Sequence, residues 1–321
     1  MKIKDIISQA ERDGRCRFSC EMLPPLKGDG TEGVFAAVDN IMEFDPAWID
    51  ITFHRETVAE RTDASGRRER HTLRRRPGTV GISAAIRSRY DVEVVPHLIC
   101  GGLSRYDIED ALIDMDFLGL HNVLALRGDK SPQEERFTPH PQGHSRAIDL
   151  LRQIMAMNRG EFVDGLVDEC HHSTFSAGVA GYPEVHSDAL SPEDDIMRLK
   201  EKVDAGADYI ITQLFFDNQK FFDFCRRCRE AGIEVPIIPG IKPLATAKHL
   251  EILPAIFGTE LPAELVAEVN SHADNAAAVR RIGTEWCIRQ CRELKAAGVP
   301  VLHLYTMSRT DQIAEVLRQV L

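Results

Sequence analysis

Acidic, amide and aromatic side chains stand at the ends of eight apolar runs, where they could bind a ligand or transfer a proton. The runs cover residues 17–21, 47–53, 92–98, 122–127, 175–182, 208–214, 235–240 and 300–306. At or beside their C-terminal ends lie Glu21, Thr52, His97, Arg127, Asp129, Tyr182, Gln213, Gly240 and Tyr305. If the runs are parallel strands of a barrel, these ends converge on one face. The spacing therefore predicts one candidate active site, assembled from distant parts of the chain.

The segments between the runs have the composition and length of helices. The runs themselves are continuously rich in Val, Ile, Leu and Phe, which is typical of parallel strands buried on both faces. Helical patterns cover 31–44, 104–119, 191–206 and 217–232. This alternation predicts an α/β fold, a (β/α)8 TIM barrel, with residues 1–321 forming a single catalytic domain.

Two segments depart from the regular period. Residues 54–76 are polar and basic and interrupt the second βα unit, whereas residues 254–298 add helices before the last strand. Long insertions after barrel strands commonly shape the substrate entrance. We expect no appended regulatory domain, because the chain ends soon after the eighth unit.

Composition restricts the class of protein and its location. A hydrophobic fraction of 43% can fill the core of a barrel. No apolar run is long enough to cross a membrane, and the N-terminus lacks the apolar core of a signal peptide. We therefore expect a cytoplasmic protein. The net charge of −11 argues against nucleic-acid binding, although local basic groups could still hold an anionic ligand.

Eight cysteines raise the question of metal binding. Cys225 and Cys228, like Cys287 and Cys291, fall in helical stretches and do not give the paired spacing of a zinc site. Cys170-His171-His172 is a denser group of metal ligands, whose role the sequence leaves open. Because free cysteine is a common buried residue, the prediction is reduced thiols and no metal in the active site.

Glu21 has the surroundings of a general acid. It ends the first run in FSCEMLPP, among apolar neighbours that favour the neutral carboxyl and so raise its pKa. A raised pKa is what acid catalysis at neutral pH requires. The alternative is a strand-end carboxylate paired with a lysine or arginine.

Further motifs follow later runs and suit a flat, phosphorylated ligand. Arg127 can hold phosphate, Gly128 allows close approach of the backbone, and Asp129 can place a charge beside a ring. The sequence has no Gly-x-Gly-x-x-Gly after a strand and no Walker loop, so any nucleotide must be held at the barrel mouth.

Taken together, four motifs resemble the methylenetetrahydrofolate reductase family over essentially the whole chain. They are ALRGD at 125–129, AGYPEVH at 180–186, ITQLFFD at 211–217 and HLYTMSR at 303–309. The resemblance implies a barrel that binds FAD at the C-terminal strand ends. It also implies that hydride passes from NAD(P)H through the flavin to 5,10-methylenetetrahydrofolate, both substrates using one flavin face in turn.

The resemblance also implies roles for particular residues. Glu21 matches the general acid that opens the folate ring, and Asp129 matches the aspartate near the flavin and the pterin. Gln213 matches the amide that contacts both substrates, Arg309 the partner of the folate glutamate, and Leu253 a position where an aromatic ring often stacks on the ligand. The implied FAD contacts and their immediate surroundings are Thr52, Phe53, His97, Arg127, Gly128, Asp129, Ala147, Tyr182, His186, Asp195 and Lys202. Arg198 and Glu201 replace residues that often hold the flavin in this family.

Two other functions remain as alternatives at this level. One is another FAD-barrel oxidoreductase, similar to proline dehydrogenase, which has no need of the Glu21 and Gln213 pair. The other is a flavin- or folate-binding subunit of a larger electron-transfer assembly, for which Cys170-His171-His172 could hold a metal. The sequence does not decide between NADH and NADPH, and it is compatible with a homo-oligomer.

Overall fold

Eight parallel strands close into a barrel, as the sequence predicts. The computed structural model describes residues 1–63, 65–131, 134–165, 171–307 and 309–321. Around the barrel the strands follow the order β1-β10-β9-β8-β7-β6-β5-β2, and every neighbouring pair is parallel. Their bounds are β1 Arg17–Met22, β2 Trp48–Ile51, β5 Glu93–Ile99, β6 Asn122–Leu126, β7 Ser176–Gly181, β8 Tyr209–Leu214, β9 Ile237–Ile241 and β10 Val301–Tyr305. Each lies within one residue of its predicted run or inside it.

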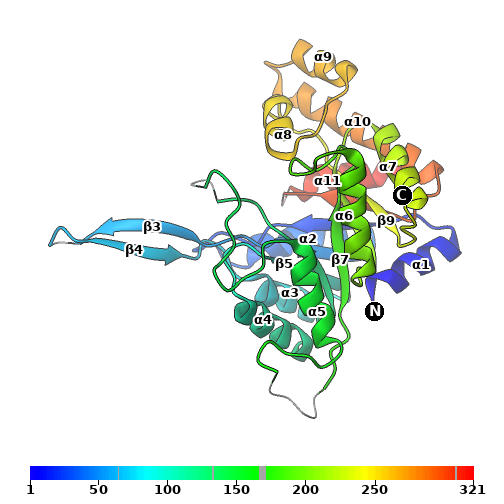
Figure 1. Ribbon diagram of the computed structural model, residues 1–321. Helices are drawn as coiled ribbons and strands as arrows, with labels where there is room; N and C mark the ends of the chain where they lie inside the picture. Colours follow the sequence, from blue (N-terminus) through cyan, green and yellow to red (C-terminus); the bar gives the residue numbers. More distant parts are fainter. Residues whose placement is uncertain (64, 132–133, 166–170, 308) are drawn as a thin grey trace.

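Helices surround the barrel and enclose the main apolar core between themselves and the strands (Figure 1). They are α2 Glu32–Met42, α3 Thr79–Arg89, α4 Arg105–Phe117, α5 Ala147–Met157, α6 Pro192–Asp204, α7 Asn218–Glu230, α10 Ala276–Ala296 and α11 Thr310–Val320. Local sequence fixes several of their starts. The Ser104 hydroxyl accepts a hydrogen bond from the backbone N–H of Asp107, whose carboxylate accepts one from the backbone N–H of Ser104, a capping box. Ser191 caps α6 ahead of Pro192.

A first helix, α1 (Ile3–Asp13), closes the N-terminal end of the barrel. Ile3, Ile6, Ile7 and Ala10 are buried against apolar side chains from the lower parts of the strands, among them Trp48. This apolar plug excludes water from one end of the barrel, so a ligand can enter from the opposite end.

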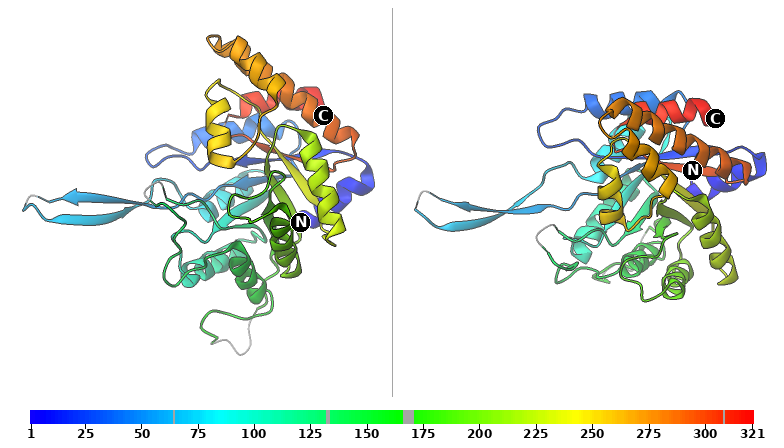
Figure 2. Two further views of the ribbon diagram at one scale, coloured as in Figure 1. Left: turned by 45° about the horizontal axis from the view of Figure 1, so that its top comes forward. Right: turned by 90° about the horizontal axis from the view of Figure 1, so that it is seen from above.

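The two insertions have different structures. Residues 54–76 contain an antiparallel hairpin, β3 (Thr57–Thr62) and β4 (Arg68–Leu73), which projects away from the barrel (Figures 1 and 2). The sequence analysis did not anticipate this hairpin, because its strands are polar and charged. In its turn, Asp63 accepts hydrogen bonds from the backbone N–H groups of Ser65 and Arg67.

The second insertion adds α8 (His249–Phe257) and α9 (Ala263–Ser271) before α10. The predicted boundary at residue 254 is five residues late, because α8 already begins at His249 and contains Pro254 in its interior. Leu253, Leu265, Val269 and Ile282 form a separate apolar cluster that joins these helices to the barrel mouth.

The apolar plug gives a stability prediction. Ile7 is 0% exposed, whereas Ile113 on α4 is 46% exposed. Ile7→Ala should lower the free energy of unfolding by about 2–5 kcal/mol, because it leaves a cavity in a packed interior. Ile113→Ala is the matched control and should change it by less than about 1 kcal/mol. Denaturant titration of both variants measures the difference; equal effects would show that α1 does not close the barrel tightly.

Candidate active site

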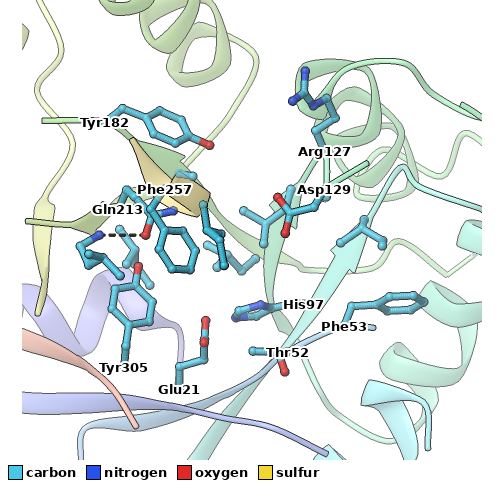
Figure 3. Close-up of a pocket in the computed structure, with 18 of the residues that line it drawn as sticks. Glu21, Thr52, Phe53, His97, Arg127, Asp129, Tyr182, Gln213, Phe257 and Tyr305 are labelled. Atoms are coloured by element: carbon cyan, nitrogen blue, oxygen red, sulfur yellow. Dashed lines mark hydrogen bonds between the residues drawn. The ribbon is translucent and has the colours of Figure 1, made fainter. Parts of the chain in front are cut away.

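One large cavity, of about 1160 Å³, opens at the C-terminal ends of the strands. The predicted site residues come from seven different strands and their loops, and they come together around this cavity (Figure 3). Its lining contains Glu21, Thr52, Phe53, His97, Arg127, Gly128, Asp129, Ala147, Tyr182, His186, Asp195, Lys202, Gln213, Leu253 and Arg309. The structure therefore places every predicted site residue on one cavity, while the role of each stays a prediction.

Glu21 lies on β1 and points into the cavity from its floor (Figure 3). Burial raises the pKa of its carboxyl from about 4.5 to about 7; the nearby His97 and Lys242 act in the opposite direction, whereas Asp50 acts in the same direction. The hydroxyl of Thr306 donates a 2.6 Å hydrogen bond to the backbone carbonyl of Glu21, which fixes the strand at this point. A carboxyl with this pKa keeps a large protonated fraction at neutral pH.

Below the floor lies a buried polar network that the sequence analysis missed. The carboxylate of Asp50 is fully buried, accepts a 2.6 Å hydrogen bond from Trp48 Nε1 and lies 3.4 Å from His97 Nε2. His303 Nδ1 lies 2.8 Å from Ser19 Oγ, and burial lowers the pKa of His303 to about 4, so its ring is neutral. The available signal was a charged or polar residue inside an apolar run, in WIDITF and VLHLYT.

The wall formed by β6, β7 and their loops carries cations. Arg127 forms an ion pair with Asp188 and lies over the ring of Phe137, with its guanidinium carbon 5.2 Å from the centroid. Gly128 has φ +80°, and a Cβ atom there would lie 3.1 Å from Ile99 side-chain carbons. Glycine is therefore required both by the backbone conformation and by the close approach.

Lys202 adds a second cation to this wall. Its ammonium donates a 2.7 Å hydrogen bond to the backbone carbonyl of Ala180, and burial lowers its pKa to about 8. Asp195, on the same helix, accepts a 2.9 Å hydrogen bond from the backbone N–H of His186. The rings of Tyr182 and His186 contact each other edge to face, with centroids 4.6 Å apart. This wall can hold a phosphate-bearing ligand beside an aromatic surface.

The adjoining wall, formed by β8, β10 and α8, combines an amide with aromatic rings. Gln213 Oε1 accepts a 2.9 Å hydrogen bond from the backbone N–H of Leu214, which leaves its NH₂ group to face the cavity. The hydroxyl of Tyr305 donates to the backbone carbonyl of Thr212 at 2.7 Å. Leu253 is only 2% exposed and packs mainly into the α8–α10 cluster. Phe257, one helical turn further on, points its ring into the cavity (Figure 3) and was missed by the sequence analysis.

Asp129 and Arg309 occupy exposed positions on the cavity rim. Asp129 follows Gly128 at the end of β6 and lies across the cavity from Gln213 (Figure 3). Arg309 precedes α11, and its exposed side chain is free to meet a ligand that extends out of the mouth.

The structure gives no support for a metal centre in the described residues. No group of three or more His, Cys, Asp and Glu side chains there could hold a metal ion. Cys170 lies outside the described residues, while His171 Nε2 lies 3.4 Å from a carboxylate oxygen of Asp116. The described cysteines are free thiols, and burial raises the pKa of several of them, Cys225 and Cys228 included.

Among the residues that the structure describes, no helix is long and apolar enough to span a membrane.

The fold and the cavity define a (β/α)8 barrel protein with a large ligand site at the C-terminal face of its strands. A sequence model of the methylenetetrahydrofolate reductase family matches residues 6–321. The chain belongs to this family, which sets aside the alternative of a barrel similar to proline dehydrogenase.

Individual relatives agree with this assignment. The "Probable methylenetetrahydrofolate reductase (NADH)" of Oryza sativa subsp. japonica is 35% identical over 317 residues, covering 96% of this chain and 48% of the relative. The "5,10-methylenetetrahydrofolate reductase" of Escherichia coli (strain K12) is 28% identical over 311 residues, covering 96% of this chain and 92% of the relative. The chain thus spans about half the length of the plant relatives it matches.

Among solved structures, the fold is shared with a protein from Clostridium thermocellum that is described as binding two copies of 5-methyl-5,6,7,8-tetrahydrofolic acid. The TM-score is 0.56 at 13% identity, covering 98% of this chain and 97% of the other. At this identity the likeness concerns the fold alone.

The raised pKa of Glu21 predicts a pH-dependent stability. Between pH 4.5 and 7 the folded state holds a proton that the unfolded state has lost, so this contribution to stability is complete below pH 4.5 and is lost as the pH rises through 7. Glu21→Gln does not titrate. Wild type should therefore lose melting temperature relative to Glu21→Gln from pH 5 to pH 8. Thermal melts of the two proteins across this range measure the effect; a constant difference would contradict the raised pKa.

Proposed function

We propose that this chain reduces 5,10-methylenetetrahydrofolate to 5-methyltetrahydrofolate with electrons from a reduced nicotinamide, using bound FAD. Membership of the methylenetetrahydrofolate reductase family supports the reaction. The observation that carries the proposal is the presence of a carboxyl with a pKa of about 7, the Asp129 carboxylate and the Gln213 amide on one cavity.

The cavity residues fit FAD. The volume of about 1160 Å³ exceeds that of pockets for ordinary small ligands and suits a dinucleotide together with a substrate. Arg127 and Lys202 would hold its phosphates, and Gly128 would let the backbone approach its ring. FAD held there would supply the hydride-transfer chemistry between the nicotinamide and the folate.

Two residues at this wall limit the number of cations available for the flavin. Arg198 forms a 2.9 Å ion pair with Asp194 and donates to the backbone carbonyl of Asp188, so its charge is already partly neutralised. Glu201 adds a carboxylate to the cavity lining. Arg127 is likewise paired, with Asp188, so we propose that Lys202 supplies most of the attraction for the phosphates and that Arg127 adds to it.

In this proposal Glu21 supplies the proton that opens the folate ring. Its burial keeps a large fraction of the carboxyl protonated at neutral pH, and its place on the cavity floor lets it reach a substrate nitrogen. Protonation of that nitrogen breaks the carbon–nitrogen bond of the five-membered ring and leaves a cationic iminium as the hydride acceptor. The Asp129 carboxylate stabilises this cation across the cavity, while the Gln213 amide orients the heterocycle without adding charge.

The partners and the location belong to the same proposal. Relatives carry names with NADH and with NADPH, so the choice of donor is not decided by the family. We infer a cytoplasmic enzyme that acts on these small molecules and forms a homo-oligomer, without nucleic-acid or membrane partners.

The FAD proposal predicts a strong effect of one lysine. Lys202→Met should weaken FAD binding about tenfold or more, because a hydrogen bond to a charged group contributes about 1.5–3 kcal/mol. Lys200→Met is the matched control, since Lys200 lies on the same helix but forms its ion pair with Asp204 outside the cavity. Titration of flavin-free protein with FAD, followed by flavin absorbance and fluorescence, measures both affinities. If wild type takes up no FAD, the cofactor proposal fails.

The acid role of Glu21 predicts that the two half-reactions separate. Hydride transfer from nicotinamide to flavin does not need the Glu21 proton, but ring opening does. Glu21→Gln should leave flavin reduction within about twofold of wild type and slow flavin reoxidation by methylenetetrahydrofolate about 100- to 10,000-fold, the usual contribution of a general acid. Anaerobic stopped-flow absorbance measures both steps. Equal slowing would assign Glu21 a structural role, and no slowing would place the acid elsewhere.

A further inference from the structure

Lys242 is a buried cation for which the proposed reaction has so far no use. It directly follows β9, lines the cavity and is only 9% exposed. Among the described residues, its ammonium has no ion pair within 4.0 Å and no hydrogen bond. Burying an ammonium group without such partners is costly, so a charge at somewhat longer range should compensate it.

The barrel register places Lys242 on the same level as Glu21. Strand β10 lies between β1 and β9, and it pairs Glu21 with Tyr305 on one side and Ile241 with Leu304 on the other. Lys242 follows Ile241 as Tyr305 follows Leu304, so the three residues Glu21, Tyr305 and Lys242 form a row across adjacent strands. Residues in register on parallel strands share a face, and two strand spacings amount to about 10 Å. Both long side chains project from this row into one cavity.

The other charged groups near Lys242 cannot balance it. Arg309 is a further cation, and Cys287 on α10 is buried. His249 on α8 is neutral, because burial and the nearby cations lower its pKa to about 4; its Nδ1 accepts a hydrogen bond from the backbone N–H of Ala245. Among the described groups that act on the lysine, Glu21 is the carboxyl that favours its charged form.

Glu21, for its part, faces one competing anion. Its charged surroundings are His97 on β5, Asp50 on β2 and Lys242 after β9. His97 Nε2 lies 3.4 Å from a carboxylate oxygen of Asp50, and His97 favours the Glu21 carboxylate more strongly than Lys242 does. Once Glu21 has given up its proton, its carboxylate remains in a poorly solvated site, and Lys242, together with His97, is a group that stabilises it.

We propose that Lys242 is a positioning residue for the general acid, whose ammonium stabilises the Glu21 carboxylate that remains after proton transfer. This inference rests on the proposed function, in which Glu21 is the general acid. The electrostatic coupling between Lys242 and Glu21 can nevertheless be tested by itself. The lysine makes Glu21 a stronger acid than burial alone would allow. Because Lys242 lies two strands away from Glu21, it lowers the pKa of Glu21 only moderately, and Glu21 still carries a proton at neutral pH.

The direct test is an infrared titration of Glu21. The C=O band of the protonated carboxyl is assigned by its loss in Glu21→Gln and is then followed against pH in wild type and variants. Lys242→Met should move the Glu21 midpoint upward by about 1.2–1.5 pH units, the effect of a charge roughly 8–10 Å away at an effective dielectric constant of about 20. Lys242→Arg should stay near wild type. Lys242→Gln gives a second neutral variant if the methionine protein does not fold.

A matched control removes the same charge elsewhere. Lys4 lies at the closed end of the barrel, where it pairs with Asp208. Lys4→Met should therefore leave the Glu21 midpoint unchanged. A midpoint that does not move in either neutral Lys242 variant, or one that moves equally in Lys4→Met, would overturn the proposal.

The folate half-reaction supplies the second measurement. The reoxidation rate should fall at high pH as Glu21 ionises. The neutral Lys242 variants should shift this fall to higher pH by the same amount as the Glu21 midpoint, without changing the KM for folate. A KM raised about tenfold with an unmoved Glu21 midpoint would instead make Lys242 a cation for a substrate anion, and overturn the proposal. A shifted midpoint in a protein that reduces no folate would support the coupling and overturn the proposed function.

Discussion

Closure of eight parallel strands is the constraint on which the rest of the structure depends. Because all strands run in one direction, their carboxyl ends meet at one face, and residues almost 300 positions apart become neighbours, as Glu21 and Tyr305 show. The interior below that face is filled by apolar side chains and closed by α1. Water and ligand therefore share a single described entrance, at the face where the polar strand ends lie. The fold thus determines the location of the active site, and the individual residues at that face determine which reaction can take place there.

The buried polar network shows how the barrel tolerates charge beneath this entrance. Asp50 is a carboxylate in a fully buried position, which would be costly without hydrogen bonds. Trp48 supplies one, and His97 approaches from the next strand. Having a satisfied anion already in place below the floor, the protein disfavours a second one above it, which adds to the effect of burial on Glu21. Within this network Asp50 helps to keep the Glu21 proton in place, whereas His97 acts in the opposite direction.

The sequence predicts the strands and their ends well, because each strand is a short apolar run with a polar end. Residues whose position follows from that pattern, such as Glu21, Asp129 and Gln213, could be assigned to one face in advance. Asp50, His303 and Lys242 could not, since their importance depends on which strands are neighbours and in which register. The place of Phe257 on the cavity could not be predicted either, because it depends on the residue at which α8 begins, and Pro254 is not expected inside a helix. The hairpin β3–β4 has no apolar pattern to reveal it, because it packs mainly on itself.

The distribution of charge in the cavity explains why an acid and several cations can share it. Arg127 and Lys202 belong to the wall formed by β6, β7 and α6, and each is already engaged, with Asp188 and with the Ala180 carbonyl respectively. Glu21 lies on the floor, well apart from Arg127 (Figure 3). A guanidinium in direct contact would lower the pKa of Glu21 by one to three units, and the proton would be lost at neutral pH. A lysine two strands away is a compromise between these requirements, since it can stabilise the product carboxylate without removing the proton beforehand. The separation of cations from the acid is therefore as necessary to the proposed reaction as their presence on one cavity.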